Sequence, residues 1–278
     1  MVLRQILRTF AIANSINQMS FRAASSKAIT SIDSSDRAPI VWVDTTWPFE
    51  GADAGSARTL EILRLMRQSG RRVVFVYLGL GVKPASVPGV ELRFSLRSAI
   101  RDARSTSALE PIVWFSRVQS GVLWSSAIRR LLPESRSVFD TVDLSYRRLQ
   151  SIAYSQGSKN IARLARKFFK IEADLALSSF KTVVVSDLEM SEIVSLGKVS
   201  AHVIPTIHEN ISQTRLSENT RGLVFVGNFA HFPNEEGLEW FLNSVWPLLS
   251  SRVRGEGLVV VGKNVPKHLH RQETSEVL

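Results

Sequence analysis

The sequence predicts an α/β protein with one complete parallel-sheet domain and the start of a second. From Pro39 onward, short apolar runs alternate with helical patterns, which is typical of a parallel sheet with helices on both faces. The chain has 278 residues, near the length at which one core stops growing and chains divide into domains. A second strand, turn and helix pattern begins at Leu223, close to the end of the sequence.

The first domain is predicted over residues 39–205. Its expected strands are the runs PIVWVD, RRVVFVYLG, GVELRFS, PIVWFS, SVFDTVD, KTVVVS and AHVIP. Between them we expect helices from Ser56 to about Ser69, near 96–106, near 119–132, and over a basic region from about 144 to 178 that is broken at SQGSKN. Gly70 and Pro133 end two of these helices, and Ser186 with Glu189 forms a capping box for the last one.

The polar residues 206–221 form a linker to the second predicted domain, 222–278. Its opening run, LVFVGNFAHFPNEEGLEWF, is a strand followed by a helix for which Asn234 is the expected N-cap. One further strand, GLVVVG, follows. Two strands and one helix do not bury a doubly wound core, so we expect an incomplete domain that exposes strand edges and apolar surface.

Residues 1–38 form a basic N-terminal extension with no acidic residue before Asp33. Apolar residues recur at helical spacing in its first ten positions, with Arg4 and Arg8 on the other face. Two interpretations remain open: a disordered or docking extension, and a targeting segment or amphipathic helix on a membrane. No apolar run approaches the roughly 18 to 20 residues of a membrane-spanning helix.

The balance of 35 basic and 25 acidic residues gives a net charge of +10, which favours a polyanionic neighbour. A phosphorylated substrate, an anionic membrane and nucleic acid all fit the charge. We expect no nucleic-acid partner, because the basic run ARLARKFFK is typical of a solvated helical stripe with Phe168 and Phe169 on its buried side.

The absence of cysteine excludes disulfides and fits a reducing compartment. We expect a cytoplasmic location, with peripheral contact to an anionic membrane as an alternative.

The loop WPFEGADAGSARTLEIL follows the first strand, at the sheet edge where open α/β sheets bind ligands. Gly51 and Gly55 allow close approach of a ligand to the backbone. Ser56 begins a helix whose free N–H groups suit an anion. An ordinary βα loop with a serine cap explains the same residues.

A second candidate segment, FDTVDLSYRR, places Asp140 and Asp143 at the end of another strand. Two carboxylates there can orient a hydroxyl group or act as a base, although capping of the next helix explains one of them equally well. No histidine or further acid completes a metal shell, so no metal site is expected. The run GLVVVGKN is rejected as a phosphate-binding loop, because its four middle residues are the strand itself.

In the second domain, Gly227, Asn228 and His231 follow the opening strand. Glu235 and Glu236 complement the helix dipole but repel a phosphate, so an anion is expected nearer the Gly227–Asn228 backbone. A lone loop histidine such as His231 is more often simply exposed.

Five collinear segments resemble one family, the bacterial family 4 (group 1) glycosyltransferases. The segments are WPFEGADAGSARTLEILRLMRQSGRRVVFV, VFDTVDLSYRR, VVVSDLEMSEI, HVIPTIHEN and FVGNFAHFPNEEGLEWFLNSVWPLL, and they span about residues 39 to 265. The last resembles the F-V-G-G-F-x-H-x-P-N opening of the family's second domain and is the most specific. Each of the others is modest alone, but their shared order strengthens the resemblance.

The resemblance implies a GT-B-like fold, in which a first Rossmann-like domain holds the acceptor and a second holds the donor. It implies transfer of a sugar from a nucleotide-sugar to a glycan or lipid-linked acceptor in polysaccharide or glycoconjugate synthesis, without a cofactor or a required metal. Carried over by position, the implied ligand-facing residues are Gly55, Ser56, Arg58, Asp140, Asp143, Gly227, Asn228 and His231.

Two departures from the family pattern bear on activity. Ser145 stands where the family's D-x-V-D-L-H segment has histidine. No segment after Gly262 supplies the family's pair of glutamates or its diphosphate-binding helix. We therefore expect a C-terminally shortened enzyme with impaired activity. The alternative is a non-catalytic protein that keeps acceptor binding.

Overall fold

The computed structural model describes residues 37–51, 53–77, 79, 86–131, 136–207, 221–229 and 232–267. The chain divides into two compact units, Met1–Glu209 and Asn210–Leu278. The predicted N-terminal extension lies almost entirely outside the described residues. No helix in the described ranges is long and apolar enough to cross a membrane.

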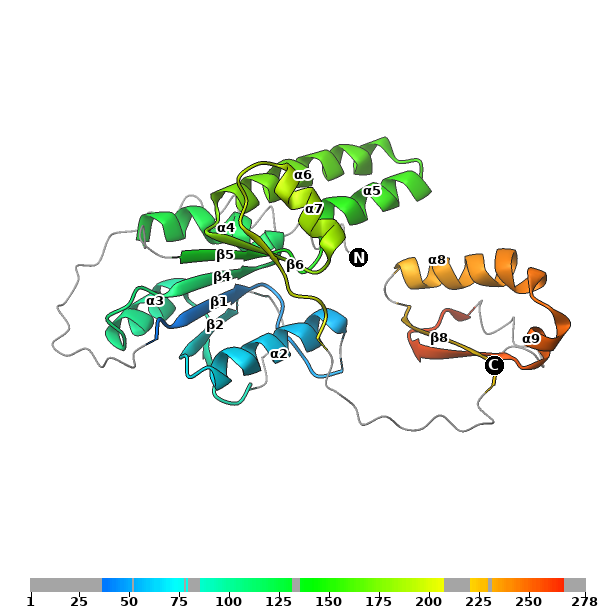
Figure 1. Cartoon of the computed structure of the whole chain (residues 1–278), viewed down its shortest axis with the longest axis horizontal. Helices are drawn as coiled ribbons and strands as arrows, with labels where there is room; N and C mark the ends of the chain where they lie inside the picture. Colours follow the sequence, from blue (N-terminus) through cyan, green and yellow to red (C-terminus); the bar gives the residue numbers. More distant parts are fainter. Residues whose placement is uncertain are drawn as a thin grey trace. The chain divides into compact units, whose positions relative to one another are not determined.

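The first unit is built on a seven-stranded, wholly parallel sheet in the order β3-β2-β1-β4-β5-β6-β7 (Figure 1). Its strands are β1 (Ile40–Asp44), β2 (Val73–Tyr77), β3 (Glu91–Arg93), β4 (Ile112–Ser116), β5 (Arg136–Asp140), β6 (Lys181–Val184) and β7 (Ala201–Val203). The order reverses between β1 and β4, and this reversal is the point at which open α/β sheets bind ligands. The predicted fold class is confirmed.

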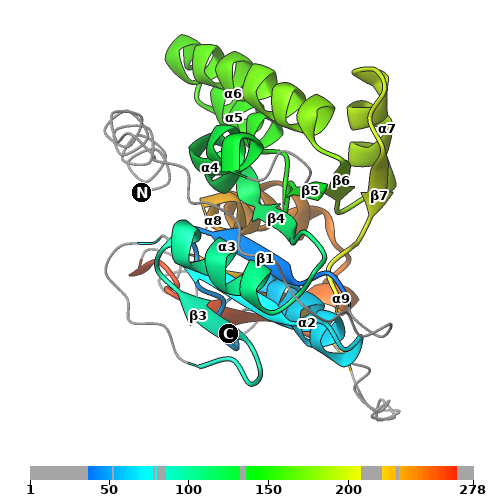
Figure 2. The ribbon, with the colours of Figure 1, turned by 90° about the vertical axis from the view of Figure 1, so that its left-hand side faces the viewer.

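Six described helices cover the two faces of this sheet: α2 (Ala54–Gln68), α3 (Leu96–Ser105), α4 (Arg117–Leu131), α5 (Ser145–Ser155), α6 (Lys159–Ser178) and α7 (Asp187–Ser195). Figure 1 shows α2 on the opposite side of the strands from α4 and α6, and Figure 2 shows the same separation in a view turned by 90°. Gly70 and Gly157 follow α2 and α5 with φ of 78° and 59°, values that glycine adopts readily after a helix.

Strand residues alternate between the two cores, as a pleated strand requires. On the α2 face, Trp42 stacks on Trp114 with ring centroids 5.1 Å apart. On the other face, Val41, Val43 and Phe115 pack with the apolar residues of α3. Both faces are buried, which explains why the strands are continuous apolar runs in the sequence.

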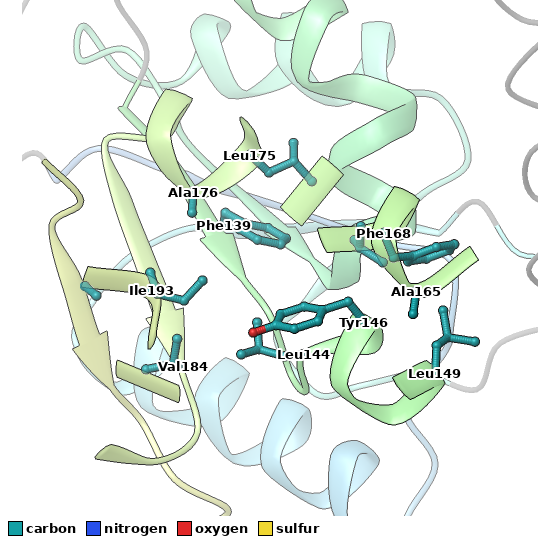
Figure 3. Close-up of a cluster of buried hydrophobic side chains, with 12 residues drawn as sticks. Phe139, Leu144, Tyr146, Leu149, Ala165, Phe168, Leu175, Ala176, Val184 and Ile193 are labelled. Atoms are coloured by element: carbon teal, nitrogen blue, oxygen red, sulfur yellow. The ribbon is translucent and has the colours of Figure 1, made fainter. Parts of the chain in front are cut away.

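A further core lies between β5, β6 and the helices α5, α6 and α7 (Figure 3). Phe168 and Ala165 of α6 pack with Tyr146 and Leu149 of α5 in this core. Phe169, expected on the buried side of the helix, is 38% exposed, and its ring meets Tyr146 edge to face.

The second unit has a two-stranded parallel sheet of β8 (Leu223–Asn228) and β9 (Leu258–Lys263). The connection consists of α8 (Phe232–Trp240), a π turn η1 (Phe241–Val245), a 3-10 turn η2 (Trp246–Leu248) and α9 (Ser251–Gly255). Phe229, Leu238, Trp246 and Leu258 form its small core.

One face of the β8–β9 pair carries two exposed valine pairs. Val224 lies beside Val259, and Val226 beside Val261. These four side chains are 66%, 47%, 72% and 49% exposed, respectively. A parallel sheet normally buries both faces, so the described part of this unit leaves one face uncovered.

Candidate functional site at the carboxyl edge of the first sheet

An aspartate and an arginine lie on either side of the point where the strand order reverses. Asp44 ends β1, and Arg117 follows β4 as the first residue of α4. The Nη1 group of Arg117 donates a hydrogen bond to Oδ2 of Asp44. Asp44 is fully buried, whereas the Arg117 side chain is 20% exposed. The pair therefore has one buried member and one that reaches the surface.

Burial raises the pKa of Asp44, and four neighbours oppose this effect. Arg117 contributes its charge, Thr46 and Thr45 contribute backbone hydrogen bonds, and Ser116 contributes a side-chain hydrogen bond. Thr46 N lies 2.9 Å from Oδ1 of Asp44. The carboxyl group is therefore held by partners on both oxygen atoms.

The backbone around this pair adopts unusual conformations. Arg117 has φ of 70° and Val142, just after β5, has φ of 60°. A left-handed conformation costs a non-glycine residue about 1–2 kcal/mol. Such strain concentrates at sites of ligand binding and catalysis. Two of the three non-glycine residues with positive φ in the described chain are thus next to the reversal point.

Gly55, in the first turn of α2, lies close to both Arg117 and Val142. A Cβ atom at Gly55 would lie 3.3 Å from Nη2 of Arg117 and 3.7 Å from Cγ1 of Val142. Because Gly55 has no side chain, the Arg117 guanidinium can lie close to the α2 backbone. Among the described residues, Asp44 and the Ser116 hydroxyl are the acceptors of Arg117, and both contacts use Nη1. Nη2 and Nε remain as donors for a ligand.

The helix α2 begins earlier than the sequence predicts. Asp53, not Ser56, is its N-cap, and its carboxylate accepts a hydrogen bond from Ser56 N at 2.7 Å. The prediction for Ser56 is therefore wrong as to its capping role, and the residue is 2% exposed. Gly51 precedes the helix with φ of 66°, and a Cβ atom added there would meet no other atom within 4 Å.

Arg58 and Asp140, both expected to face a ligand, lie inside the protein and bind each other. Nη1 of Arg58 is 2.9 Å from Oδ2 of Asp140, and the two side chains are 1% and 0% exposed. Nε of Arg58 donates to the Ile204 carbonyl. The same Oδ2 accepts from the Trp114 indole N–H, and Oδ1 accepts from Val142 N at 3.1 Å. Asp140 thus holds the backbone at Val142, and both of its oxygen atoms accept hydrogen bonds from within the protein.

Asp143 differs from Asp140 in its exposure. Its side chain is 42% exposed and forms an ion pair with Arg148. Among the two predicted carboxylates, Asp143 is the one that solvent or a ligand reaches.

The segment between β5 and α5 is anchored by Glu172, which the sequence did not identify, and by Glu189, which was expected only in a capping box. Glu172 of α6 accepts backbone hydrogen bonds from Ser145 and Tyr146, and so caps α5. Burial raises the pKa of Glu172 to about 8, against the effect of the Ser145 N–H. Ser145 itself is 3% exposed.

Glu189 forms the other anchor by accepting from Leu144 N and Val185 N. Ser186 caps α7 by accepting from Glu189 N, as predicted. The Glu189 carboxylate, however, binds the neighbouring loop and does not complete the capping box.

In the second unit, Gly227 and Asn228 end β8. A Cβ at Gly262 of β9 would lie 1.7 Å from the Gly227 carbonyl oxygen, so glycine is required at 262. The Asn234 amide donates to the Asn228 carbonyl at 3.0 Å, and the Asn264 amide donates to the Asn228 side chain at 3.1 Å. Asn234 lies inside α8, so its prediction as the N-cap is wrong. His231 lies outside the described residues.

Within the described ranges, no group of three or more histidine, aspartate and glutamate side chains is placed to hold a metal ion.

No protein-family model and no curated protein matches the chain. Among solved structures, a sucrose-phosphate synthase from Thermosynechococcus elongatus matches with a TM-score of 0.53 and 14% identity. The match covers 86% of this chain and 64% of that protein's chain. A glycotransferase of kitacinnamycin matches with a TM-score of 0.43 and 12% identity, covering 87% of this chain and 69% of that chain. The first likeness and the sheet topology establish a GT-B-like α/β fold, and this chain spans about two thirds of the length of those structures.

Proposed function

We propose that this protein is a glycosyltransferase whose first unit binds the acceptor at the carboxyl edge of its sheet. The observation that carries the proposal is the meeting of Gly55, Arg117 and Val142 at the reversal point, with Asp44 buried behind Arg117. The likeness to a sucrose-phosphate synthase supports a fold suited to this chemistry.

The chemistry of the pair favours hydroxyl-rich ligands. Arg117 and Asp44 neutralise each other, while Nη2 and Nε of Arg117 remain as oriented donors. A planar guanidinium with fixed geometry suits neighbouring oxygen atoms of a sugar. The proposed acceptor is therefore a glycan, free or lipid-linked, that places a hydroxyl group near this edge.

In the proposed reaction, the acceptor oxygen bonds to the anomeric carbon while the bond from that carbon to the diphosphate breaks. The hydroxyl proton passes to a base, and we assign Asp143 this role because its side chain is 42% exposed, whereas that of Asp140 is buried. The nucleoside diphosphate leaves with the bonding electrons. Gly227, Asn228 and His231 are the proposed donor-side residues.

The test is calorimetric titration of the full chain with nucleotide-sugars and the corresponding free nucleotides, followed by a turnover assay with glycan acceptors. Micromolar binding of a nucleotide-sugar and release of its nucleoside diphosphate support the proposal. An Arg101→Gln variant serves as the control for Arg117→Gln, because Arg101 is exposed and lies on α3 outside the site. The proposal is contradicted if the folded chain binds neither a nucleotide-sugar nor a glycan.

A second candidate is an acceptor-binding protein without transferase activity. The described part of the second unit has two strands, and the chain spans 64% of the matched synthase. Glycan binding that is lost in Arg117→Gln, with no nucleotide-sugar binding, favours this candidate.

A further inference from the structure

The outward face of α6 carries a row of basic side chains. Lys159, Arg163, Arg166 and Lys170 are all exposed and follow a spacing of four, three and four residues. This spacing places them on one helical stripe about 16 Å long. The stripe lies opposite the face that buries Ala165, Phe168 and Leu175, which point into the core in Figure 3.

Together α5 and α6 form a helical hairpin, and most of its length carries only positive charge. Residues 144–171 contain seven arginine and lysine residues and no acidic residue. Arg147 pairs with Glu192, and Arg148 with Asp143. The four stripe residues have no acidic partner within the described chain, so their charge is directed to solvent. An ordinary solvent-exposed helix carries charges of both signs, so a stripe of positive charge alone is unusual for a helix that faces only water.

Three large apolar side chains are exposed near the ends of α5 and α6. Tyr154, in the last turn of α5 where the hairpin begins to reverse, is 91% exposed. Leu177 continues the line of the stripe two turns after Lys170 and is 48% exposed. Phe180 is 52% exposed, with the Arg136 guanidinium 5.3 Å from its ring centroid.

A basic stripe together with exposed apolar side chains favours a lipid surface over a polyanion in solution. Tyrosine and leucine next to lysine and arginine are the side chains that enter the boundary between headgroups and acyl chains. Asp174, near the C-terminal end of the same face, limits the basic region to the first three turns of α6.

We propose that the α5–α6 hairpin docks this protein onto an anionic lipid surface. The basic stripe contacts headgroup phosphates, and Tyr154 and Leu177 insert at the headgroup level. The inference goes beyond the proposed function and does not depend on it, because vesicle binding needs no glycosyl transfer.

The test is co-sedimentation of the full chain with vesicles of phosphatidylglycerol and phosphatidylcholine, against phosphatidylcholine alone. Each basic residue near such a surface contributes about fivefold to affinity. The triple variant Arg163→Gln, Arg166→Gln and Lys170→Gln is expected to bind about 100-fold more weakly. The matched control, Arg67→Gln, Arg101→Gln and Lys198→Gln, loses the same charge from other exposed positions and is expected to retain binding within about threefold.

A Tyr154→Ala variant separates lipid from other polyanions. It is expected to weaken vesicle binding several-fold while leaving binding to heparin unchanged, because heparin offers no apolar layer. Equal losses in the stripe and control variants overturn the proposal. Stripe-dependent binding of heparin or RNA without vesicle binding also overturns it.

Discussion

Two arginine–aspartate pairs lie at the same edge of the first sheet, and they differ in what surrounds the arginine. Arg58 and Asp140 are 1% and 0% exposed, and Arg58 also binds the Ile204 carbonyl. Arg117 is 20% exposed beside a fully buried Asp44. The first pair is enclosed by protein and fixes the loop after β5, whereas the second leaves donors for a ligand. An ion pair at a ligand-binding edge is therefore not by itself a ligand site.

Backbone conformation separates the two pairs as well. Arg117 has positive φ, and Arg58 lies within the regular helix α2. A fold retains a left-handed arginine only where surrounding contacts hold it in place. Here the buried carboxylate of Asp44 provides that contact.

The largest expected effect comes from breaking the enclosed pair. Arg58→Met leaves Asp140 buried without its cation, which should lower the free energy of unfolding by about 3–5 kcal/mol. Urea denaturation followed by circular dichroism measures this loss. The double variant Arg58→Met, Asp140→Asn removes the unpaired charge and should recover part of the stability. No recovery in the double variant contradicts the role assigned to the pair.

Glu172 extends the comparison to a buried carboxyl group that has backbone donors instead of a cation. Its pKa is about 8 in the folded protein, above the ordinary value of 4.5. The folded state thus keeps a proton that the unfolded state releases, so stability should fall as pH rises from about 4.5 to about 8. In Glu172→Gln this part of the decrease, on the order of a few kcal/mol, should disappear.

The measurement is the free energy of unfolding at pH 5, 6.5 and 8 for wild type and Glu172→Gln. Glu236→Gln, an exposed change in the other unit, is the control and should keep the wild-type slope. An identical pH slope in Glu172→Gln and wild type argues against a raised pKa.

Arg117→Lys tests the open pair without removing the charge that Asp44 requires. Lysine lacks the planar fork, so kcat/KM for glycosyl transfer should fall by about 10- to 100-fold while stability changes by no more than about 1 kcal/mol. Where no turnover is found, glycan affinity is the readout. Arg101→Lys is the matched control. A stable Arg117→Lys protein with unchanged activity and affinity removes Arg117 from the site.

The smallest effect concerns strain at Val142. Glycine tolerates φ of 60°, so Val142→Gly should raise the free energy of unfolding by about 1 kcal/mol at most, since the lost side-chain packing offsets part of the gain. Thermal unfolding measures the change. A clear loss of stability means that the Val142 side chain matters more than its backbone strain.

Much of the first unit follows from its sequence for a physical reason. Strands buried on both faces must be apolar throughout, so the runs PIVWVD and PIVWFS identify β1 and β4 directly. Helix beginnings are less certain, because Asp53 and Ser56 are both good caps and only the backbone decides between them.

The site itself is harder to read from the sequence. Asp44 and Arg117 lie 73 positions apart and meet only because β1 pairs with β4. A signal is present, since two similar apolar strands each end in polar residues at the same sheet edge. The left-handed conformation of Arg117 has no such signal, because arginine ordinarily avoids it. The sequence also gives no indication that Arg58 is buried, because an arginine in a helical pattern is ordinarily exposed.

The open valine face of β8 and β9 has a consequence for the behaviour of the protein in solution. Four β-branched side chains form an exposed apolar face against which a second copy can pack. In the described part of the unit the outer edges of β8 and β9 are also unpaired, so another extended segment can add there by backbone pairing. Charge repulsion from a net +10 keeps copies apart at low ionic strength. Added salt screens that repulsion and strengthens apolar contact at the same time. Colloidal stability should therefore decline with salt, and a buffer chosen to suppress non-specific charge interactions would promote self-association instead.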